Sequence, residues 1–461
     1  MKRPMMVVLA LALVAGLFTS PATAASQDRS YILLGSNDRL PADLQQKVQA
    51  AGGTVVRTLP EIGIAVVSSS NASFKDAVGE ISGVRSIAPN IKLQYIKPVD
   101  NVVLEETGNP PNSGNDDRFF DLQWGHDAIN APEAWKLGYR GKGVRVAVLD
   151  DGIDSDHPDL APNLNVALST SFVPGEPFEY TEPDPFSHGT HVAGTIAAAD
   201  NGIGVIGVAP EAELVAVKVL SSATGSGTFE GIIAAIMYTA KIQADVANMS
   251  LGAVIPRHGT CDENGCANAI EIAELQIALA RATMHAHAHG VTLIASAGNE
   301  AINFDKNWDQ IHIPSMSPGV ISISATAPEG WALNPNTNLD LPASYTNIGM
   351  EAVDFAAPGG DFDFESDATC TVAGITRLCW IFDMVFSTGS QGRYYWSAGT
   401  SMAAPHASGV AALIIGKNGG SAPAGLVEHT LIRSSDDLGP RGKDPIYGFG
   451  RVNAYRAVRQ R

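Results

Sequence analysis

Three short segments in a fixed order constrain this chain more than any other feature. They read Val-Leu-Asp150-Asp-Gly-Ile-Asp, then Ser-His188-Gly-Thr-His-Val-Ala-Gly-Thr, then Gly-Thr-Ser401-Met-Ala-Ala-Pro-His. In that order they supply a carboxylate, an imidazole and a hydroxyl, the three groups that make a serine nucleophilic at neutral pH. Each lies among small residues that let backbone approach backbone. We therefore expect a fold that brings Asp150, His188 and Ser401 together.

With this order and these neighbours, the chain resembles the subtilisin-like serine proteases over residues 123 to 458. The resemblance implies a serine endopeptidase that hydrolyses peptide bonds of proteins with broad specificity through an acyl-enzyme. It makes His188 the base, rather than His191 in the same segment, and Asp150 the residue that holds the imidazole tautomer. Asp151 departs from the family, which usually has Ser or Thr at this position.

The resemblance also implies an oxyanion donor and two substrate-binding edges. Asn299, in Ser-Ala-Gly-Asn-Glu, matches the side-chain donor of the family. Substrate is expected to lie as an extra strand between two backbone edges. The matching edge and wall residues are Gly225, Ser226, Gly227, Ser250, Leu251, Gly252, Ser296, Ala297 and Gly298. An ordinary glycine-rich loop is the alternative for the first three.

The walls of the predicted specificity pocket carry mostly small, uncharged side chains. A roomy apolar slot gains from burying a large residue, so we expect Phe, Leu, Tyr and Met before the cut bond. Glu300 at the rim would admit Lys, and His312 is expected near the floor.

A structural calcium ion is the one cofactor that the resemblance implies. A loop of matching length would offer the Asn201 side chain and alternating backbone carbonyls, and oxygen ligands of this kind suit calcium. The implied ligands are Asp116, Asp159, Ala199, Asn201, Ile203 and Val205. A solvated acidic loop is the alternative.

Composition limits the partners. The chain has 461 residues, 45% of them hydrophobic, with 46 glycines and a formal net charge of −18. This charge argues against nucleic acid, because phosphate binding requires clustered Lys and Arg. The acidity serves either solubility or cation binding. The expected partners are polypeptide substrates and the chain's own propeptide as inhibitor, and a monomer is expected.

The N-terminus predicts the compartment. Lys2 and Arg3 precede the apolar run Met5–Phe18, and a small-residue cleavage site ends at Ala24. Residues 1–24 therefore read as a secretory signal peptide, too short to span a bilayer comfortably. Because no later stretch approaches a membrane span, we expect no membrane association and a secreted product, with the periplasm possible in transit.

The cysteine pattern supports the prediction that the chain is exported. The cysteines form two local pairs, Cys261 with Cys266 and Cys370 with Cys379, in a compartment where disulfides persist. A four-cysteine zinc site is the alternative, but both pairs lack its usual two-residue spacing.

Residues 25–97 read as a small separate unit. Its strand and helix signals follow a β-α-β-β-α-β order, which is ferredoxin-like. The unit resembles the propeptide of subtilisin-type zymogens, with a plain regulatory module as the alternative. Residues 98–122, rich in Pro, Gly and Asn, form the expected linker with the processing site.

Residues 123–461 read as an α/β peptidase domain. Short β-branched runs alternate with helical stretches, which predicts a mostly parallel sheet with helices on both faces. Active groups in such sheets lie at the carboxyl ends of the strands. Residues 301–341 and 359–393 are interpreted as surface insertions without an assigned role. His285, His287 and His289 form either a metal tract or the cationic end of a helix.

Two rival functions stay open. An esterase of the α/β-hydrolase type would need Gly-x-Ser-x-Gly and the order Ser, Asp, His; here Ala403 replaces the last glycine and the order is reversed. A secreted pseudoprotease or binding scaffold would need no intact triad, and active-site labelling would separate it from an enzyme.

Overall fold

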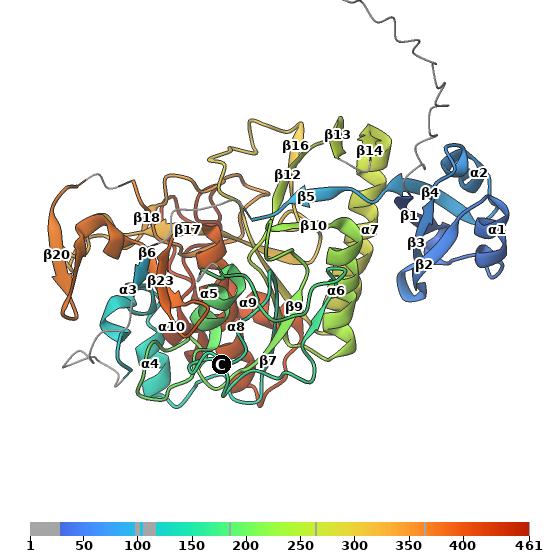
Figure 1. Ribbon diagram of the computed structural model, residues 1–461. Helices are drawn as coiled ribbons and strands as arrows, with labels where there is room; N and C mark the ends of the chain where they lie inside the picture. The colour runs from blue at the N-terminus through green and yellow to red at the C-terminus, as the bar shows by residue number, and fades with distance from the viewer. Residues whose placement is uncertain are drawn as a thin grey trace, which may run out of the picture.

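A computed structural model describes residues 28–96, 102–104, 117–183, 186–262, 265–363 and 366–460. The predicted signal peptide, Asp116 and most of the linker lie outside these residues. Two units are visible in Figure 1: a small one at the blue end of the chain and a larger one built around a central sheet.

The small unit is an antiparallel sheet of four strands with two helices, in the predicted β-α-β-β-α-β order. Its strands run β2-β3-β1-β4 across the sheet. One sheet face packs on the helices through buried residues such as Leu33, Val48 and Phe74. The elements are β1 (Arg29–Gly35), α1 (Leu44–Ala50), β2 (Thr54–Leu59), β3 (Ile64–Ser69), α2 (Phe74–Gly79) and β4 (Val84–Pro89).

The large unit contains the mostly parallel sheet that the apolar runs predict. Its strands run β18-β17-β15-β11-β7-β9-β8, and β19 pairs with β17. The pairs among β7, β9, β11, β15 and β17 are parallel, and only β18 is antiparallel to its neighbour. The bounds are β7 (Arg145–Asp150), β8 (Thr170–Ser171), β9 (Glu213–Lys218), β11 (Val246–Met249), β15 (Thr292–Ser296), β17 (Val320–Ala327), β18 (Leu341–Pro342) and β19 (Phe355–Pro358).

Helices cover both faces of this sheet. Strand β7 shows why: Val146 and Val148 belong to one buried cluster, whereas Ala147 and Leu149 belong to another. A strand buried on both faces has no polar alternation, which is the pattern of its sequence. The helices are α5 (His188–Ala197), α6 (Phe229–Lys241), α7 (Ala269–Ala288), α8 (Thr400–Lys417), α9 (Ala424–Ser434) and α10 (Ala454–Arg459).

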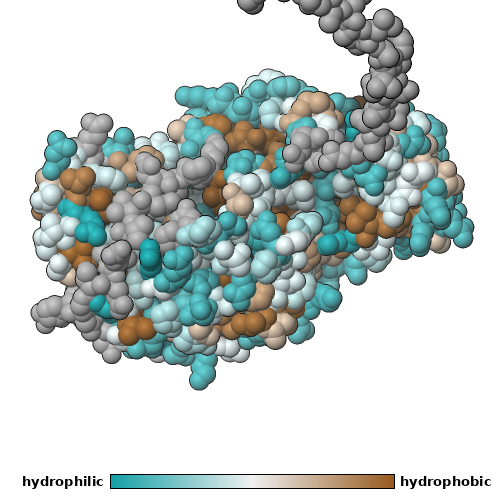
Figure 2. All heavy atoms as spheres, viewed as in Figure 1, coloured by the Kyte–Doolittle hydropathy of each residue, from teal (hydrophilic) through white to brown (hydrophobic). Residues whose placement is uncertain are grey.

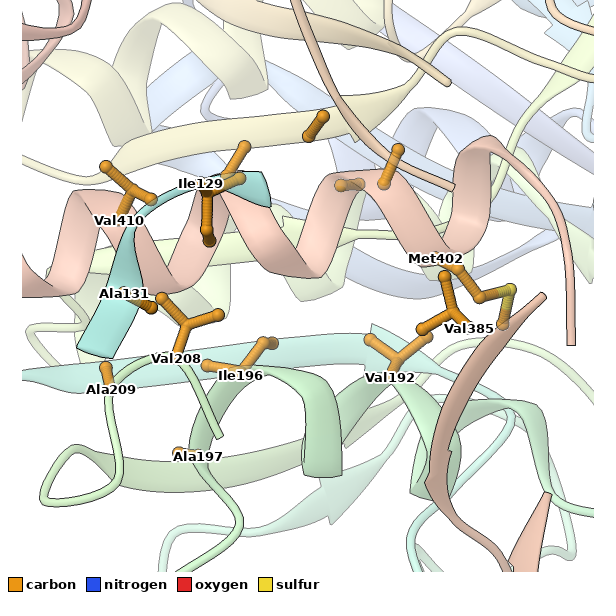
Figure 3. Packing of buried hydrophobic residues seen from close by; sticks show 14 of the residues in the cluster. Ile129, Ala131, Val192, Ile196, Ala197, Val208, Ala209, Val385, Met402 and Val410 are labelled. Atoms are coloured by element: carbon orange, nitrogen blue, oxygen red, sulfur yellow. The ribbon is translucent and has the colours of Figure 1, made fainter. Parts of the chain in front are cut away.

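Helices α5 and α8 lie on one face and pack against each other. Figure 3 shows their apolar side chains in the layer between them, with Val192 and Ile196 from α5 and Met402 from α8. A glycine also lets α5 approach the neighbouring strand β22 (Val385–Thr388) closely. A Cβ on Gly194 of α5 would lie 2.1 Å from Thr388 Oγ1, so no larger residue fits there.

The end of the predicted linker belongs to the core of the large unit. Phe119, Phe120 and Leu122 are buried, and Phe119 packs edge-to-face against Phe386 and Tyr394. The sequence places these residues in the linker because Pro, Gly and Asn dominate the preceding stretch. Their aromatic and apolar side chains instead close the core.

Both cysteine pairs are disulfides, and each closes a two-stranded hairpin. Cys261–Cys266 joins β13 (Gly259–Asp262) to β14 (Gly265–Asn268) at an exposed position. Cys370–Cys379 lies at the base of the hairpin of β20 (Thr369–Val372) and β21 (Ile375–Leu378), and both of its residues are buried.

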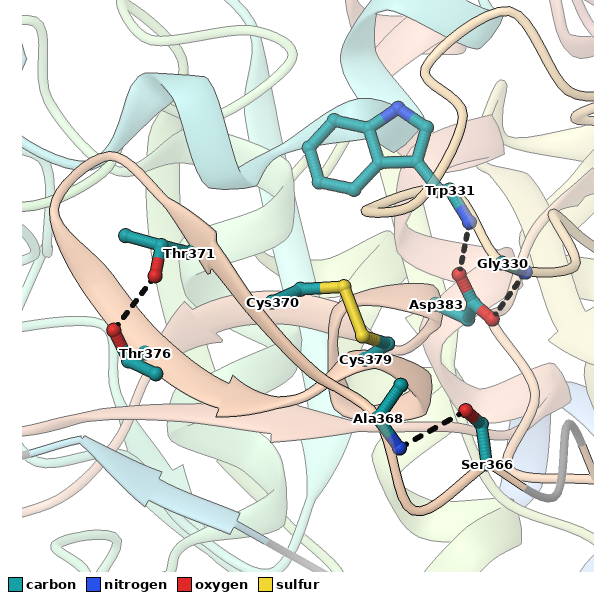
Figure 4. The surroundings of a disulfide bond; sticks show 9 residues. All are labelled: Gly330, Trp331, Ser366, Ala368, Cys370, Thr371, Thr376, Cys379 and Asp383. Carbon is teal, nitrogen blue, oxygen red and sulfur yellow. Dashed lines mark hydrogen bonds between the residues drawn. A yellow bond between two sulfur atoms is a disulfide. The ribbon is translucent and has the colours of Figure 1, made fainter.

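The two predicted insertions contact each other beside the second disulfide, which lies within the second insertion. Figure 4 shows Trp331, from the first insertion, beside the Cys370–Cys379 bridge of the second. The Asp383 carboxylate accepts hydrogen bonds from the backbone N–H groups of Gly330 and Trp331, both at 2.7 Å. Burial raises the pKa of Asp383 to about 6, although these two bonds oppose the shift.

The visible surface is mostly hydrophilic, with separate apolar patches (Figure 2). Within the described ranges, no helix combines the length and apolarity that a membrane crossing requires.

Candidate active site

Asp150 and His188 come from two elements that meet at the carboxyl edge of the sheet. Asp150 ends β7, and His188 is the first residue of α5, behind the N-cap Ser187. His188 Nδ1 lies 2.8 Å from Asp150 Oδ1 and 3.0 Å from Oδ2. The helix start comes this close because Gly189 follows; a Cβ there would lie 2.2 Å from the Gly152 carbonyl oxygen. This contact directs the Nδ1 proton to the carboxylate and leaves Nε2 free of a proton.

Both side chains are buried, and the charge of Asp150 raises the pKa of the His188 imidazole. Burial lowers the pKa of His188, but the charge of Asp150, its hydrogen bond and the charge of Asp151 together leave the pKa above its ordinary value. By contrast, burial lowers the pKa of His191 to about 3. Its Nε2 lies 3.2 Å from the carbonyl oxygens of Val385 and Tyr395. His191 therefore packs between α5 and the two strands that contain Val385 and Tyr395.

Ser401 stands in the first turn of α8, and a proline shapes its surroundings. Pro405, one turn later, has no N–H for the Ser401 carbonyl oxygen, so the normal helical bond is missing. The hydroxyl of Ser250 donates to that oxygen instead, at 2.7 Å. In return, the Ser401 hydroxyl donates to the Ser250 carbonyl oxygen at 3.1 Å. Because Ser250 directly follows β11, these bonds fasten the nucleophile to the strand between β7 and β15.

Two nitrogen donors lie near one point beside Ser401. A Cβ on Gly399 would lie 3.3 Å from Asn299 Nδ2 and 3.6 Å from the backbone nitrogen of Ser401. Glycine leaves that point open. The Asn299 amide is held by its oxygen, which accepts hydrogen bonds from the backbone and hydroxyl of Thr400 at 2.9 and 2.7 Å. The amide nitrogen is thereby turned toward the open point, an arrangement that can stabilise an oxyanion.

A strand from the small unit lies in the cleft beside these groups. β5 (Lys92–Gln94) pairs antiparallel with β10 (Ser226–Thr228), within one of the predicted substrate edges. The Gly225 carbonyl oxygen accepts from the N–H groups of Tyr95 and Ile96, at 3.2 and 3.1 Å. Tyr95 and Ile96 line the same pocket as His188 and Ser401.

Charged pairs hold the small unit on helices α6 and α7, where it lies in Figure 1. Arg57 Nε lies 3.0 Å from Glu230 Oε1 of α6. Arg85 makes two bonds to Glu274 of α7, at 2.9 and 3.2 Å, and Lys75 pairs with Glu271. In these three pairs the small unit supplies the cation, whereas Arg281 of α7 lies 2.9 Å from Asp38 of the small unit in the opposite sense.

His312, which the sequence expects near the floor of the pocket, lines the same pocket as His188 and Ser401. It lies on β16 (Gln310–Ile313), opposite Val254 of β12 (Ala253–Pro256). A Cβ on Gly252 would lie 2.0 Å from the ring, and a Cβ on Gly298 would lie 2.7 Å from both His312 Nε2 and Glu300 Oε2. The ring is oriented by Ser315, whose Oγ lies 2.7 Å from Nδ1. The two glycines therefore admit an imidazole and a carboxylate to the pocket.

The predicted calcium ligands surround Asp159, which is buried. Its Oδ2 accepts from the Val205 N–H at 2.9 Å, and Asn201 Nδ2 lies 3.4 Å from Oδ1. Burial raises the pKa of Asp159 to about 7, although bonds from Val205, Tyr394 and Asn201 oppose this. A buried carboxylate among neutral donors, beside backbone carbonyls, fits a calcium ion chemically.

One feature of this loop differs from the implied ligand set. The Asn201 oxygen accepts from the Ile203 N–H at 3.1 Å, so the amide nitrogen faces Asp159. Calcium binding would require this amide to turn. Asp116 lies outside the described residues, and within them no group of three or more His, Cys, Asp or Glu is arranged to hold a metal.

The histidine tract lies at the end of α7, against the small unit. The rings of His285 and His289 stack with centroids 4.1 Å apart. They line a cavity together with Arg57 and Glu61 of the small unit. Parallel rings do not aim two nitrogens at one ion, so the tract has the geometry of an interface.

The comparisons with known proteins agree with this geometry. Residues 141–450 match the model of the subtilase family of peptidases. The chain belongs to the subtilase family. This family consists of serine proteases, and its central α/β sheet is the one described above.

The relatives include subtilisin NAT of Bacillus subtilis subsp. natto, which is 36% identical over 337 residues, 73% of this chain and 71% of the relative. Subtilisin of Bacillus pumilus is 35% identical over 337 residues, 73% of this chain and 98% of the relative. In structure, this subtilase resembles the epidermin leader peptide processing serine protease of Staphylococcus aureus. The two match with a TM-score of 0.73 at 21% identity, over 95% of this chain and 100% of the other.

Sequence reasoning missed three residues in or beside the site. Lys218, at the end of β9, is fully buried and pairs with Glu176 at 3.1 Å. The sequence shows Lys218 only as one residue within the apolar run 214–220. Tyr95 and Ile96 read as the tail of a small unit, because an isolated strand that pairs with a distant loop leaves no periodic signal.

Proposed function

We propose that this subtilase is a secreted serine endopeptidase with Asp150, His188 and Ser401 as its triad and Asn299 as oxyanion donor. The observation that carries this proposal is the shared pocket. The pocket is lined by His188, Asn299 and Ser401, and the imidazole of His188 lies 2.8 Å from the Asp150 carboxylate.

In the acylation step, His188 Nε2 takes the proton of the Ser401 hydroxyl as Oγ attacks the scissile carbonyl carbon. The carbonyl oxygen becomes an oxyanion at the point faced by Asn299 Nδ2 and the Ser401 N–H. The imidazolium of His188 is stabilised by Asp150. It then gives its proton to the leaving amine, and the acyl-enzyme remains. In the second step, water attacks the acyl carbonyl carbon while His188 Nε2 takes a proton from it. The bond to Ser401 Oγ then breaks, the serine receives that proton from His188, and the acid product leaves.

We further propose that residues 25–97 inhibit the enzyme and that the zymogen processes itself near the cleft, within residues 98–122. Support comes from β5, which pairs with β10 at the edge where substrate is expected to pair, and from Tyr95 and Ile96, which continue this contact to Gly225. A backbone-paired segment in the cleft excludes other polypeptides, whatever their side chains.

Calcium belongs to the proposal as a structural ion held by Asp159, Asn201 and the carbonyl oxygens of Ala199, Ile203 and Val205, with Asp116 from the N-terminal side. When bound, it would neutralise the Asp159 carboxylate and tie the 199–205 loop to the segment that precedes α5.

Broad specificity is proposed for the residue before the cut bond. The pocket walls at Gly252, Ser296 and Gly298 are small, and substrate recognition rests mainly on backbone pairing. The ring of His312 limits the depth of the pocket.

A fluorophosphonate probe tests the proposal directly. We expect the secreted wild-type enzyme to be labelled on Ser401 and to hydrolyse a protein substrate, and Ser401→Ala to do neither while keeping its melting temperature. Labelling of wild type without peptide hydrolysis would favour an esterase, and no labelling would favour a binding scaffold.

A further inference from the structure

Asp151 connects the two segments that carry the proposed acid–base pair. It follows Asp150, and its backbone N–H donates to Asp150 Oδ1 at 2.8 Å. Its own carboxylate Oδ1 accepts from the Gly189 N–H, also at 2.8 Å. Gly189 is the residue after His188, in the first turn of α5, where N–H groups have no partner within the helix. The Asp151 side chain therefore anchors the helix end that presents the imidazole.

The backbone of Asp151 is held as firmly as its side chain. Its carbonyl oxygen accepts from the Ser222 hydroxyl at 2.8 Å and from the buried ammonium of Lys218. Lys218 in turn pairs with Glu176, which is partly exposed. Asp151 itself is buried, so water contributes little to balancing its charge.

We propose that Asp151 is a positioning residue, a second carboxylate that fixes the start of α5 and adds negative charge beside His188. This inference rests on the proposed function. It assigns a role to a position where Ser or Thr would supply neither the charge nor the reach. During acylation His188 becomes a cation, and two neighbouring carboxylates stabilise that cation better than one.

Electrostatics support this role. The charged groups around the Asp151 carboxylate are Asp150 on β7, His188 on α5 and Lys218 on β9, with Glu176 behind Lys218. Burial and the charge of Asp150 raise the pKa of Asp151, while the charge of His188, the hydrogen bond from the Gly189 N–H and the charge of Lys218 oppose this shift and favour the ionised carboxylate. The charge of Asp151 in turn raises the pKa of His188. The charges of Asp151 and His188 therefore each influence the pKa of the other group.

The test separates the charge from the hydrogen bond. Asp151→Asn keeps an oxygen for the Gly189 N–H but removes the charge, and Asp151→Ser removes both. The readout is the pH profile of kcat and KM for one peptide substrate. Glu428→Gln, an exposed charge change on α9, is the matched control.

For Asp151→Asn we expect the acid limb of kcat/KM to move to lower pH by about half a unit or more, because the imidazolium loses a favourable charge. We expect kcat at the plateau to fall about three- to tenfold with KM unchanged, and Asp151→Ser to lose more than about tenfold. The control should match wild type.

An acid limb for Asp151→Asn that coincides with wild type would overturn the inference, even if the melting temperature falls. If Asp151→Asn is not secreted, Asp151→Glu tests the role of charge instead, because this variant keeps the carboxylate. Its acid limb should coincide with wild type while kcat falls, and a displaced limb would overturn the role of charge. An active wild type with unshifted variants refutes this inference alone, whereas an inactive wild type refutes the proposed function as well.

Discussion

The backbone N–H of Gly252 donates a hydrogen bond to the carbonyl oxygen of Tyr95, at 3.2 Å. One residue belongs to the wall of the specificity pocket and the other to the N-terminal unit. A segment of the chain is thus bound through the same kind of main-chain contact that an extended substrate would make.

This contact predicts how the N-terminal unit inhibits. Tyr95 is buried, and its hydroxyl has no hydrogen-bond partner among the described residues. Burial also raises its pKa. In a trans-inhibition assay with segment 26–97, Tyr95→Ala should weaken inhibition by roughly tenfold or more through lost apolar contact. Tyr95→Phe should inhibit at least as well as wild type, since it removes an unpaired polar group. Equal inhibition by all three segments would contradict this.

Triad residues should behave as one unit. Ser401→Ala or His188→Ala should each lower kcat by roughly 10⁴–10⁶-fold, and the double variant should be scarcely worse than Ser401→Ala. Asn299→Ala should cost about 10²–10³-fold in kcat with little change in KM, because its donor acts on the oxyanion. Single-substrate kinetics on purified variants measure these losses. Strictly additive losses would mean that the residues act separately.

His312 should limit the size of the residue before the cut bond. Removing the ring in His312→Ala deepens the pocket, so kcat/KM for a Phe peptide relative to the matching Ala peptide should rise about tenfold. Ser315→Ala keeps the bulk of the ring, loses the 2.7 Å hydrogen bond that orients it, and so separates the effect of orientation from that of ring volume. If His312→Ala leaves the Phe/Ala ratio unchanged, the ring does not form the floor.

Calcium dependence should follow the ionisation of Asp159. Without the ion, burial holds the pKa of this carboxyl at about 7, well above its unfolded value. Its contribution to stability is then fully present below the unfolded pKa and is lost as the pH rises through 7. At high pH a calcium ion would bind the ionised carboxylate and offset that loss of stability. At low pH the carboxyl is protonated and would bind calcium only weakly.

A chelator should therefore lower the melting temperature at pH 8 much more than at pH 5. Asp159→Asn should show no such chelator effect at either pH. Identical melting curves with and without chelator at pH 8 would exclude the ion.

The two disulfides should differ in their effect on stability. Each closes a short loop, worth about 2–3 kcal/mol in the loop-entropy model. Cys261–Cys266 is exposed, whereas Cys370 and Cys379 are buried beside Trp331. Replacing the second pair by serine should lower the melting temperature more, because it also buries two hydroxyls. Thermal unfolding of both double variants checks this, and equal shifts would contradict it.

The sequence by itself determined the family of this protein and most of its strands and helices. Runs such as Val144–Leu149 and Val320–Ala325 are rich in β-branched and apolar residues, and they coincide within a few residues with β7 and β17. The spacing of small residues around Asp150, His188 and Ser401 likewise indicates close backbone approach. Such features are local, and local patterns are readable from one strand or one helix turn.

The tertiary structure alone decided which distant groups share a contact. Nothing in the neighbours of Pro405 shows that the Ser401 carbonyl it frees is satisfied by Ser250, 151 residues earlier. Nothing around Asp151 shows that its carboxylate reaches Gly189, and nothing around Tyr95 shows that it enters the cleft. These contacts depend on how the strands are ordered in the sheet, because strand order places residues side by side that sequence separation keeps apart.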